Sequence, residues 1–317
     1  MLNEIPTAHT NNSYDKSPGS KLLTGERLVL ANTDERFPDA LRNIPRPPKV
    51  LRLVGNAAAL DEGISIIGAR KATPYGLGCA RRFAEIAATL GVNVVSGGAL
   101  GCDSEAHRGA IDGGGRTVAI LGGGCDQLYP MRNKRLFQQI IDSGGAIVSE
   151  RDWDEPPLPW MFRERNRLIA GLSKATLVVE AGLPSGTFST ADEALAAGKD
   201  VLAIPGPIVS PTSAGSNRLI AQGAHPIIDD ETFESAMSAL FGTLRHQDAS
   251  GHAQLPDDPL IAALMANPMR PDEIIAKGFH DTPTALLQIL ANYERTGMLA
   301  RYPDGRYGPS SSWLIRR

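Results

Sequence analysis

A glycine-rich stretch, residues 94–107, has the residue types of an anion-binding turn between a strand and a helix. Glycines allow the backbone to take positive φ or to approach a ligand closely. A helix that begins near Asp103 would direct free N–H groups and the positive end of its dipole towards the turn. A tight turn that binds nothing is the alternative for this stretch taken alone. The residues that we expect to bind a phosphate here are Ser96, Gly97, Gly98, Gly101 and Asp103.

A second stretch joins arginines to aromatic rings. Residues 160–167 read Trp-Met-Phe-Arg-Glu-Arg-Asn-Arg and form the densest basic segment of the chain. Arginine beside aromatic rings suits single-stranded nucleic acid, because cations neutralise phosphates and rings stack on bases. We expect the segment to precede a helix that packs on a sheet, so that its arginines face the same edge as the glycine-rich turn. A solvated helix start with Arg–Glu pairs is the alternative. The candidate contacts are Phe162, Arg163, Arg165, Asn166 and Arg167.

Short apolar runs followed by glycine-rich loops recur along the chain and predict the elements that position these residues. The runs occupy residues 64–67, 94–96, 117–121, 177–180 and 201–204. Such runs alternating with helical segments are typical of a parallel α/β sheet, whose ligands bind at the carboxyl ends of the strands. The sequence therefore predicts several loops that converge on one binding face. The further candidate contacts in these loops are Gly68, Arg70, Lys71, Thr73, Ser185, Gly186, Thr187 and Asn217.

The composition is that of an ordinary soluble protein, with 42% hydrophobic and 21% charged residues. Because the net charge is −3, a nucleic-acid site would need its positive charge concentrated locally. No apolar run approaches the roughly 20 residues of a membrane span, and the polar start lacks a signal peptide core. The three cysteines form no CxxC pair, which argues against a disulfide framework or a zinc site. We expect a cytoplasmic protein with no cofactor, metal site or membrane contact.

The chain divides into four predicted segments. Residues 1–20 read as a disordered leader, 21–242 as a Rossmann-like domain, 243–257 as a linker and 258–317 as a small domain. Near the start of the large domain, the apolar run at residues 28–30 is followed by the segment 34–38 and an expected short helix. The small domain predicts three helices and a hairpin, the outline of a winged helix. Its third helix carries no lysine or arginine before its end, which favours an interaction or regulatory role over the reading of duplex DNA.

Taken together, the ordered motifs resemble the DprA family, also called Smf, over about residues 25–230. The motifs lie at residues 68–76, 95–107, 122–133, 162–171, 180–187, 205–206 and 217–220. The resemblance implies an extended Rossmann fold followed by a winged helix, and a homodimer that binds single-stranded DNA and loads RecA in natural transformation, without catalysis. It also implies that Arg70, Phe162, Arg163, Arg165 and Arg167 line the strand-binding pocket, with glycine-loop N–H groups on phosphates.

This chain departs from the family pattern at Ala69, where serine is usual, and at Gly98, where an apolar residue is usual. We expect Gly98 to loosen its loop. We further expect Arg70→Glu and Arg165→Glu to weaken DNA binding without unfolding the protein.

An enzyme is the competing interpretation. Residues 185–187 with Glu193 are similar to the loop of LOG-type phosphoribohydrolases, which cleave nucleotide N-glycosidic bonds. The paired glycine of their PGGxGTxxE pattern is missing, and Glu193 lies six residues after Thr187 rather than three. A nucleotide sensor on the same fold is a third possibility. No Ser/His/Asp triad is evident, and we expect His107 to orient its loop through a hydrogen bond rather than to act as a base.

Overall fold

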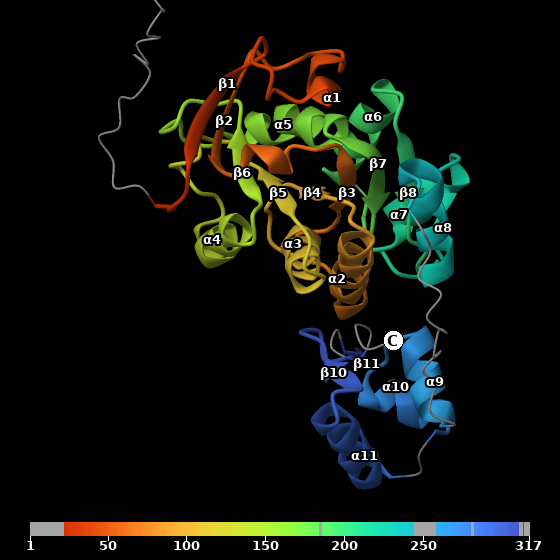
Figure 1. Cartoon of the computed structure of the whole chain (residues 1–317). Coiled ribbons are helices and arrows are strands. Elements are labelled where there is room, and N and C mark those ends of the chain that lie inside the picture. The colour runs from red at the N-terminus through yellow and green to blue at the C-terminus, as the bar shows by residue number, and fades with distance from the viewer. Residues whose placement is uncertain (1–21, 184–185, 244–257, 280–281, 311–312, 314–317) are drawn as a thin grey trace, which may run out of the picture.

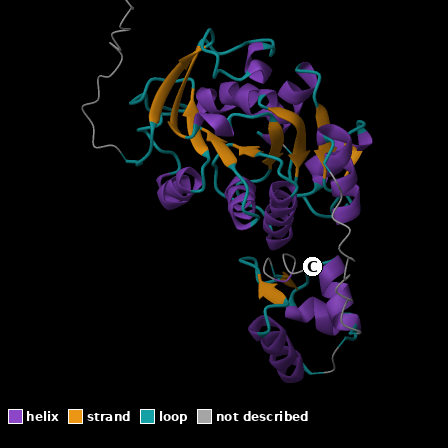
Figure 2. Ribbon diagram, in the orientation of Figure 1, coloured by secondary structure: helices purple, strands orange, loops and turns teal. Residues whose placement is uncertain are grey.

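The fold is a nine-stranded, mostly parallel sheet with helices on both faces, followed by a small helical unit with a hairpin (Figures 1 and 2). The structure is a computed structural model that describes residues 22–183, 186–243, 258–279, 282–310 and 313. The predicted leader and linker therefore lie almost entirely outside the described residues. The order of the strands across the sheet is β1-β2-β6-β5-β4-β3-β7-β8-β9.

The strands and helices of the large part follow one another in the alternation that the sequence predicts. The strands are β1 (Arg27–Ala31), β2 (Val50–Gly55), β3 (Gly63–Ile67), β4 (Val94–Ser96), β5 (Thr117–Ile120), β6 (Ala146–Ser149), β7 (Ser173–Val178), β8 (Asp200–Ala203) and β9 (His225–Pro226). The helices are α1 (Asp39–Arg42), α2 (Pro74–Thr89), α3 (Cys102–Asp112), α4 (Lys134–Asp142), α5 (Pro159–Gly171), α6 (Thr187–Ala196), α7 (Ala214–Ala221) and α8 (Asp230–Phe241), with short 3₁₀ turns at Ala57–Ala59 and Met131–Asn133.

The parallel part of the sheet, β6 to β9, is doubly wound about its middle strand, β3. From β3 the chain builds β4, β5 and β6 to one side, and then returns to build β7, β8 and β9 on the other. All pairs from β6 to β9 are parallel, whereas β1 and β2 join the β6 edge antiparallel. The strand order thus reverses beside β3, and the crevice at such a reversal is where open α/β sheets bind ligands.

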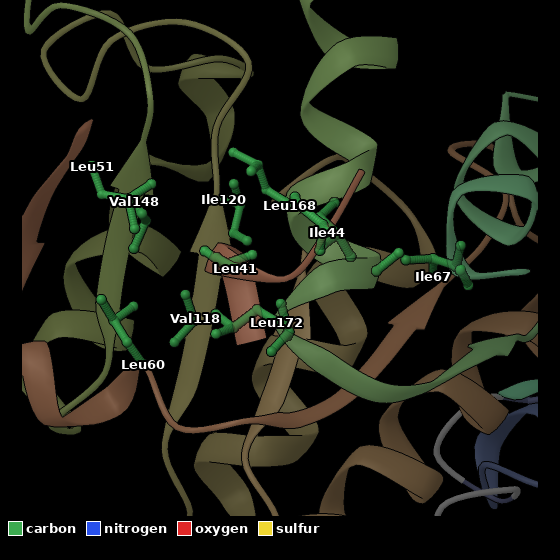
Figure 3. Packing of buried hydrophobic residues seen from close by; sticks show 14 of the residues in the cluster. Leu41, Ile44, Leu51, Leu60, Ile67, Val118, Ile120, Val148, Leu168 and Leu172 are labelled. Atoms are coloured by element: carbon green, nitrogen blue, oxygen red, sulfur yellow. The ribbon is translucent and has the colours of Figure 1, made fainter. Parts of the chain in front are cut away.

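Alternating side chains of the strands divide the core into two layers. On β5, Val118 and Ile120 face a cluster with α1, α5, α6 and α7, while Ala119 faces α4 on the opposite side. The first layer is shown in Figure 3, where Leu41 and Leu168 from α1 and α5 meet the strand residues. Helices α2, α3 and α8 cover the other face of the neighbouring strands. Successive side chains of a strand face opposite helix layers, so a shift by one residue would exchange the two sets of side chains. This alternation therefore fixes the register of the strands.

The short helix expected with residues 34–38 is α1, which begins directly after them, at Asp39. Pro38 sets this start, because the residue before a proline is disfavoured in the α region, so no helix runs through Phe37. One expectation about a helix is wrong. The arginine-rich segment does not precede a helix but lies inside α5, which begins at Pro159. Proline is favoured at the first helical position.

The C-terminal unit contains the three helices and the hairpin that the sequence predicts. They are α9 (Pro259–Ala266), α10 (Pro271–Ala276) and α11 (Pro283–Arg295), followed by β10 (Leu299–Arg301) and β11 (Tyr307–Pro309). A backbone bridge between Met269 and Tyr307 adds a third short segment to the hairpin. This arrangement is compatible with a winged helix. The unit packs near α2, with β11 beside it (Figure 1).

In the part of the chain that the structure describes, no helix combines the length and the hydropathy that crossing a lipid bilayer requires.

Candidate nucleic-acid interface

A cavity of about 870 Å³ lies at the carboxyl ends of β3, β4 and β7, at the reversal of the strand order. The loops after β3, β7 and β8 form its walls, together with one face of α5. On α5, the cavity is lined by Phe162, Arg165, Asn166 and Ile169, which follow the i, i+3, i+4, i+7 spacing of one helix face. The sequence therefore predicted correctly that these loops converge.

The structure brings many of the predicted contact residues to this cavity, but not all of them. Those that line it are Gly68, Arg70, Lys71, Asp103, Phe162, Arg163, Arg165, Asn166, Gly186 and Thr187. Gly97 lines a smaller adjoining hollow with Arg70 and Phe162. Those that line neither space are Thr73, Ser96, Gly98, Gly101, Arg167 and Asn217. Ser185 lies outside the described residues.

The glycine-rich turn after β4 is not the open anion cradle that its sequence predicts. The carboxylate of Asp103 accepts hydrogen bonds from the backbone N–H groups of Gly97 (3.2 Å) and Ala99 (3.3 Å). The protein's own anion thus occupies donors that were expected to hold a phosphate. The turn is also closely packed, since a side chain at Gly101 would run into the backbone oxygens of Ala69 and Arg70.

Gly98 tightens the turn rather than loosening it. Its φ is +65°, a left-handed conformation that favours glycine, and an added Cβ would lie 2.6 Å from the ring of Phe137 on α4. The expectation that this glycine loosens the loop is therefore wrong.

Arg165 lies beneath the turn and braces it. The side chain is only 6% exposed, and it donates hydrogen bonds to the carbonyl oxygens of Gly97 (2.8 Å) and Ile120. Burial lowers the pKa of Arg165 to about 10, although the nearby carboxylate of Asp103 opposes this shift. Burial likewise raises the pKa of Asp103, against the attraction of Arg165. The two buried charges hold the floor of the cavity, so Arg165→Glu would disrupt the fold, contrary to our expectation.

Arg167 points away from the cavity. Its guanidinium forms an ion pair with Glu150 (2.5 Å) and donates to the backbone oxygen of Arg46 (3.0 Å).

Asn217 does not line the cavity but stabilises a loop that does. Its side-chain amide makes two hydrogen bonds with the backbone of Gly206 (3.0 and 2.9 Å). That contact fixes the loop after β8, whose Pro211 and Thr212 reach the cavity wall.

Thr73 connects the loop after β3 to a buried carboxylate that the sequence analysis did not select. Its backbone N–H and its hydroxyl donate to Glu180 (2.8 and 3.0 Å), which is 2% exposed. This contact fixes the end of the loop that carries Arg70 and Lys71. Glu180 was quoted only as part of a family motif, because nothing in the local sequence shows that it reaches a residue 107 positions earlier.

Two aromatic rings meet at the mouth of the cavity. The rings of Phe162 and Tyr129 lie 5.3 Å apart at 53°, and the guanidinium of Arg70 lies 5.6 Å from the centre of the Phe162 ring. Phe162 also packs on Gly122, where an added Cβ would lie 2.9 Å from the ring. Tyr129 is 51% exposed and was missed as a site residue, although the Tyr-Pro pair belongs to the quoted motifs.

Three cations at the cavity have no carboxylate partner in the described part of the chain. Arg70, Lys71 and Arg163 are exposed and form none of the ion pairs found there. Their charges are therefore available to an external anion. This arrangement of cations beside the exposed ring of Tyr129 and the partly buried ring of Phe162 can hold a phosphate backbone and stack bases at the same time.

The residues that an enzymatic function would use, Glu193 and His107, lie outside the cavity or are buried. Glu193 forms an ion pair with Arg46 (2.7 Å) and does not line the cavity. His107 is completely buried, and burial lowers its pKa to about 3. Its Nδ1 lies 2.7 Å from the hydroxyl of Thr117, which itself donates to the backbone oxygen of Val94. His107 therefore donates to Thr117 at the start of β5, rather than orienting its own loop.

Two of the three cysteines are buried structural residues. Cys102 begins α3 against Gly68, where an added Cβ would lie 2.6 Å from its sulfur. Burial raises the pKa of Cys102 well above its usual value and that of Cys125 to about 12. Both thiols thus stay protonated, as is typical of buried structural cysteines.

Comparison with known proteins relates the chain to one family. The family model of DNA recombination-mediator protein A matches residues 28–238. The protein Smf of Escherichia coli (strain K12) is 36% identical over 300 residues, which cover 92% of this chain and 79% of that protein. The DNA processing protein DprA of Streptococcus pneumoniae is 35% identical over 222 residues, covering 70% of this chain and 74% of that protein.

Solved structures show the same relationship. The X-ray structure of DNA processing protein A from Streptococcus pneumoniae has a TM-score of 0.61 and 33% identity, over 66% of this chain and 74% of that chain. The DNA processing protein A of Helicobacter pylori, described for its unique single-stranded DNA binding mode, has a TM-score of 0.62 and 30% identity. That match covers 68% of this chain and 98% of the other.

Proposed function

Because this chain belongs to the DNA recombination-mediator protein A family, we propose that it binds single-stranded DNA in the cavity at the carboxyl ends of β3, β4 and β7. The resemblance to the DprA family that the sequence motifs indicated is confirmed by these relatives. The description of the Helicobacter pylori relative as a single-stranded DNA binder supports the proposal.

The observation that carries the proposal is the group of cations without carboxylate partners beside two rings, the exposed Tyr129 and the partly buried Phe162. Arg70, Lys71 and Arg163 supply positive charge to phosphates, while Phe162 and Tyr129 offer ring faces to bases. Phosphates carry no sequence information and every base has a π-face, so binding is expected to depend little on sequence. A duplex hides its bases from these rings, which favours the single strand.

Arg165, Asp103 and Glu180 act through the residues that contact the strand. Arg165 and Asp103 hold the glycine-rich turn in place, and Glu180 holds the loop that carries Arg70. Because these groups are buried and already hydrogen-bonded, the surface is formed before the DNA arrives. Such preorganisation lowers the entropic cost of binding.

We extend the proposal to what the family resemblance implies: a cytoplasmic homodimer that loads RecA onto the strand during natural transformation. Exposed apolar residues give the dimer some physical support. Ile208 and Val209 follow β8, Ile228 follows the neighbouring β9, and they are 93%, 75% and 67% exposed. Apolar side chains gathered at one sheet edge are typical of an interaction surface.

We also propose that the function is not catalytic. The carboxylate of the phosphoribohydrolase alternative, Glu193, is engaged by Arg46 away from the cavity. His107, the histidine within the motif at residues 95–107, is buried and neutral. A nucleotide sensor would use the same cavity, so it is separated from the strand-binding function by competition.

The proposal is tested by fluorescence anisotropy of a labelled single strand at two salt concentrations, with duplex DNA and AMP as competitors. We expect salt-sensitive binding that duplex and AMP compete poorly. Arg70→Gln combined with Arg163→Gln should weaken binding more than tenfold. Arg218→Gln is the matched control, because Arg218 is exposed, has no carboxylate partner among the described residues and lies outside the cavity. Binding of AMP in place of the strand would contradict the proposal.

A further inference from the structure

The turn that leads from Tyr129 into α4 carries three further exposed cations, Arg132, Lys134 and Arg135. None of them forms an ion pair within the described parts of the chain. We refer to the three as the basic turn. They were not selected from the sequence, because they are spread along a helix start instead of forming a run beside aromatic residues.

The basic turn is fixed to the rim of the cavity. The amide of Asn133, in the middle of the turn, donates to the backbone oxygens of Gly98 (2.9 Å) and Ala99 (3.3 Å) and to the hydroxyl of Ser104 (2.8 Å). Just before the turn, Tyr129 lines the cavity itself. A path from the cavity over Tyr129 therefore leads directly onto the three cations.

The charges of the basic turn have no explanation within the described residues. Cations at the start of a helix are opposed by the helix dipole, and the first turn of α4 contains no acidic residue to compensate. Most other arginines in the large part of the chain form ion pairs with carboxylates. These arginines are Arg27, Arg36, Arg42, Arg46, Arg52, Arg81, Arg82, Arg108, Arg116, Arg151 and Arg167. Unpartnered cations at an unfavourable position indicate an external anion.

We propose that a single strand leaving the cavity over Tyr129 continues along the basic turn, whose cations contact its phosphates outside the cavity. This inference rests on the proposed function of the cavity. Two exposed side chains favour a single strand over a duplex or an acidic protein surface. Tyr129 is 51% and Met131 54% exposed, so a ring and a flexible apolar side chain accompany the cations, as stacking of unpaired bases requires.

The test compares strands of different length. The triple variant R132Q/K134Q/R135Q and the unchanged protein are titrated with a short strand of about 5 nucleotides, which the cavity alone can hold, and with a strand several times longer. On the long strand we expect the affinity of the triple variant to fall by about tenfold or more. The slope of log affinity against log salt concentration should become shallower by about 2, as expected for three lost phosphate contacts. On the short strand its affinity should stay within about twofold of the unchanged protein's.

Controls separate this inference from the proposed function. The variant K49Q/R218Q/K277Q removes three exposed cations that likewise have no carboxylate partner among the described residues, and it should bind both strands normally. K134Q alone is measured in parallel, so that the inference can still be tested if the triple variant misfolds. Equal losses on both strands, or no loss on the long one, would overturn the path along the basic turn. The second result would leave an acidic protein partner as the occupant. Failure of the unchanged protein to bind the short strand would instead contradict the function proposed for the cavity.

Discussion

The buried Arg165 gives the sharpest test of how this site is built. We predict that Arg165→Gln destabilises the protein, whereas Arg70→Gln leaves stability unchanged and weakens DNA binding. Arg165 is 6% exposed, donates to the carbonyl oxygens of Gly97 and Ile120, and lies near the equally buried Asp103. Removing one member of a buried charge pair typically costs about 3–5 kcal/mol, because the other charge is left uncompensated. For a domain of this size each kcal/mol shifts the melting temperature by about 2–4 °C, so a fall of roughly 6–20 °C is expected.

The assay is thermal unfolding of both variants, followed by anisotropy with a labelled single strand at a temperature where each is folded. Arg70 is exposed and has no carboxylate partner among the described residues, so its variant should melt within about 2 °C of the unchanged protein. The reasoning is refuted if Arg165→Gln melts normally and yet loses binding as Arg70→Gln does. Arg165 would then contact the strand directly, as the family resemblance implied.

Three further predictions concern single side chains. Phe162→Ala should weaken single-strand binding by about 5- to 150-fold, the worth of one stacked base, while Phe162→Tyr should bind nearly normally in the same anisotropy assay. Gly98→Ala should lower the free energy of unfolding by about 1–3 kcal/mol in urea titrations, because φ is +65° and the ring of Phe137 blocks a Cβ. His107 has its pKa lowered to about 3 from 6.5, so its neutral form contributes stability that is complete above pH 6.5 and lost as the pH falls towards 3. At a pH of about 4.5 the loss should be on the order of 3 kcal/mol, and His107→Gln should lose correspondingly less stability over the same fall in pH than the unchanged protein.

The sequence predicted the framework well because its signals are local. Each β-branched run that precedes a glycine loop became a strand, and residues 64–67 correspond to β3 apart from one added residue, Gly63. Alternation of such runs with helices is sufficient to predict a parallel sheet and one binding edge. The start of α1 directly after Pro38 is also local in origin, since a proline restricts the backbone of the residue before it.

The errors at the site come from contacts between distant residues. Nothing in the local sequence distinguishes Arg163, Arg165 and Arg167 from one another. The packing of α5 leaves Arg163 exposed, buries Arg165 against the carbonyl oxygen of Gly97, and places Arg167 in an ion pair with Glu150. Similarly, the glycine-rich turn was predicted to be an open anion site, because nothing in the local sequence shows that the Asp103 carboxylate accepts hydrogen bonds from the N–H groups of Gly97 and Ala99. Residue type and spacing gave the location of the site but not the role of each charge.

The distribution of ion pairs explains how a chain of net charge −3 can present a surface for a polyanion. Carboxylates neutralise arginines over much of the large part of the chain, as in the pairs of Arg27 with Asp126 and Arg82 with Asp230. Each such pair cancels a charge that would otherwise attract DNA without specificity. Six cations without a carboxylate partner among the described residues lie on either side of Tyr129. They are Arg70, Lys71 and Arg163 at the cavity and Arg132, Lys134 and Arg135 on the basic turn. The local electrostatic potential of these cations, rather than the net charge of the protein, then attracts the DNA strand. Because exposed charges are screened over about 10 Å at moderate salt, this attraction acts only close to the cavity.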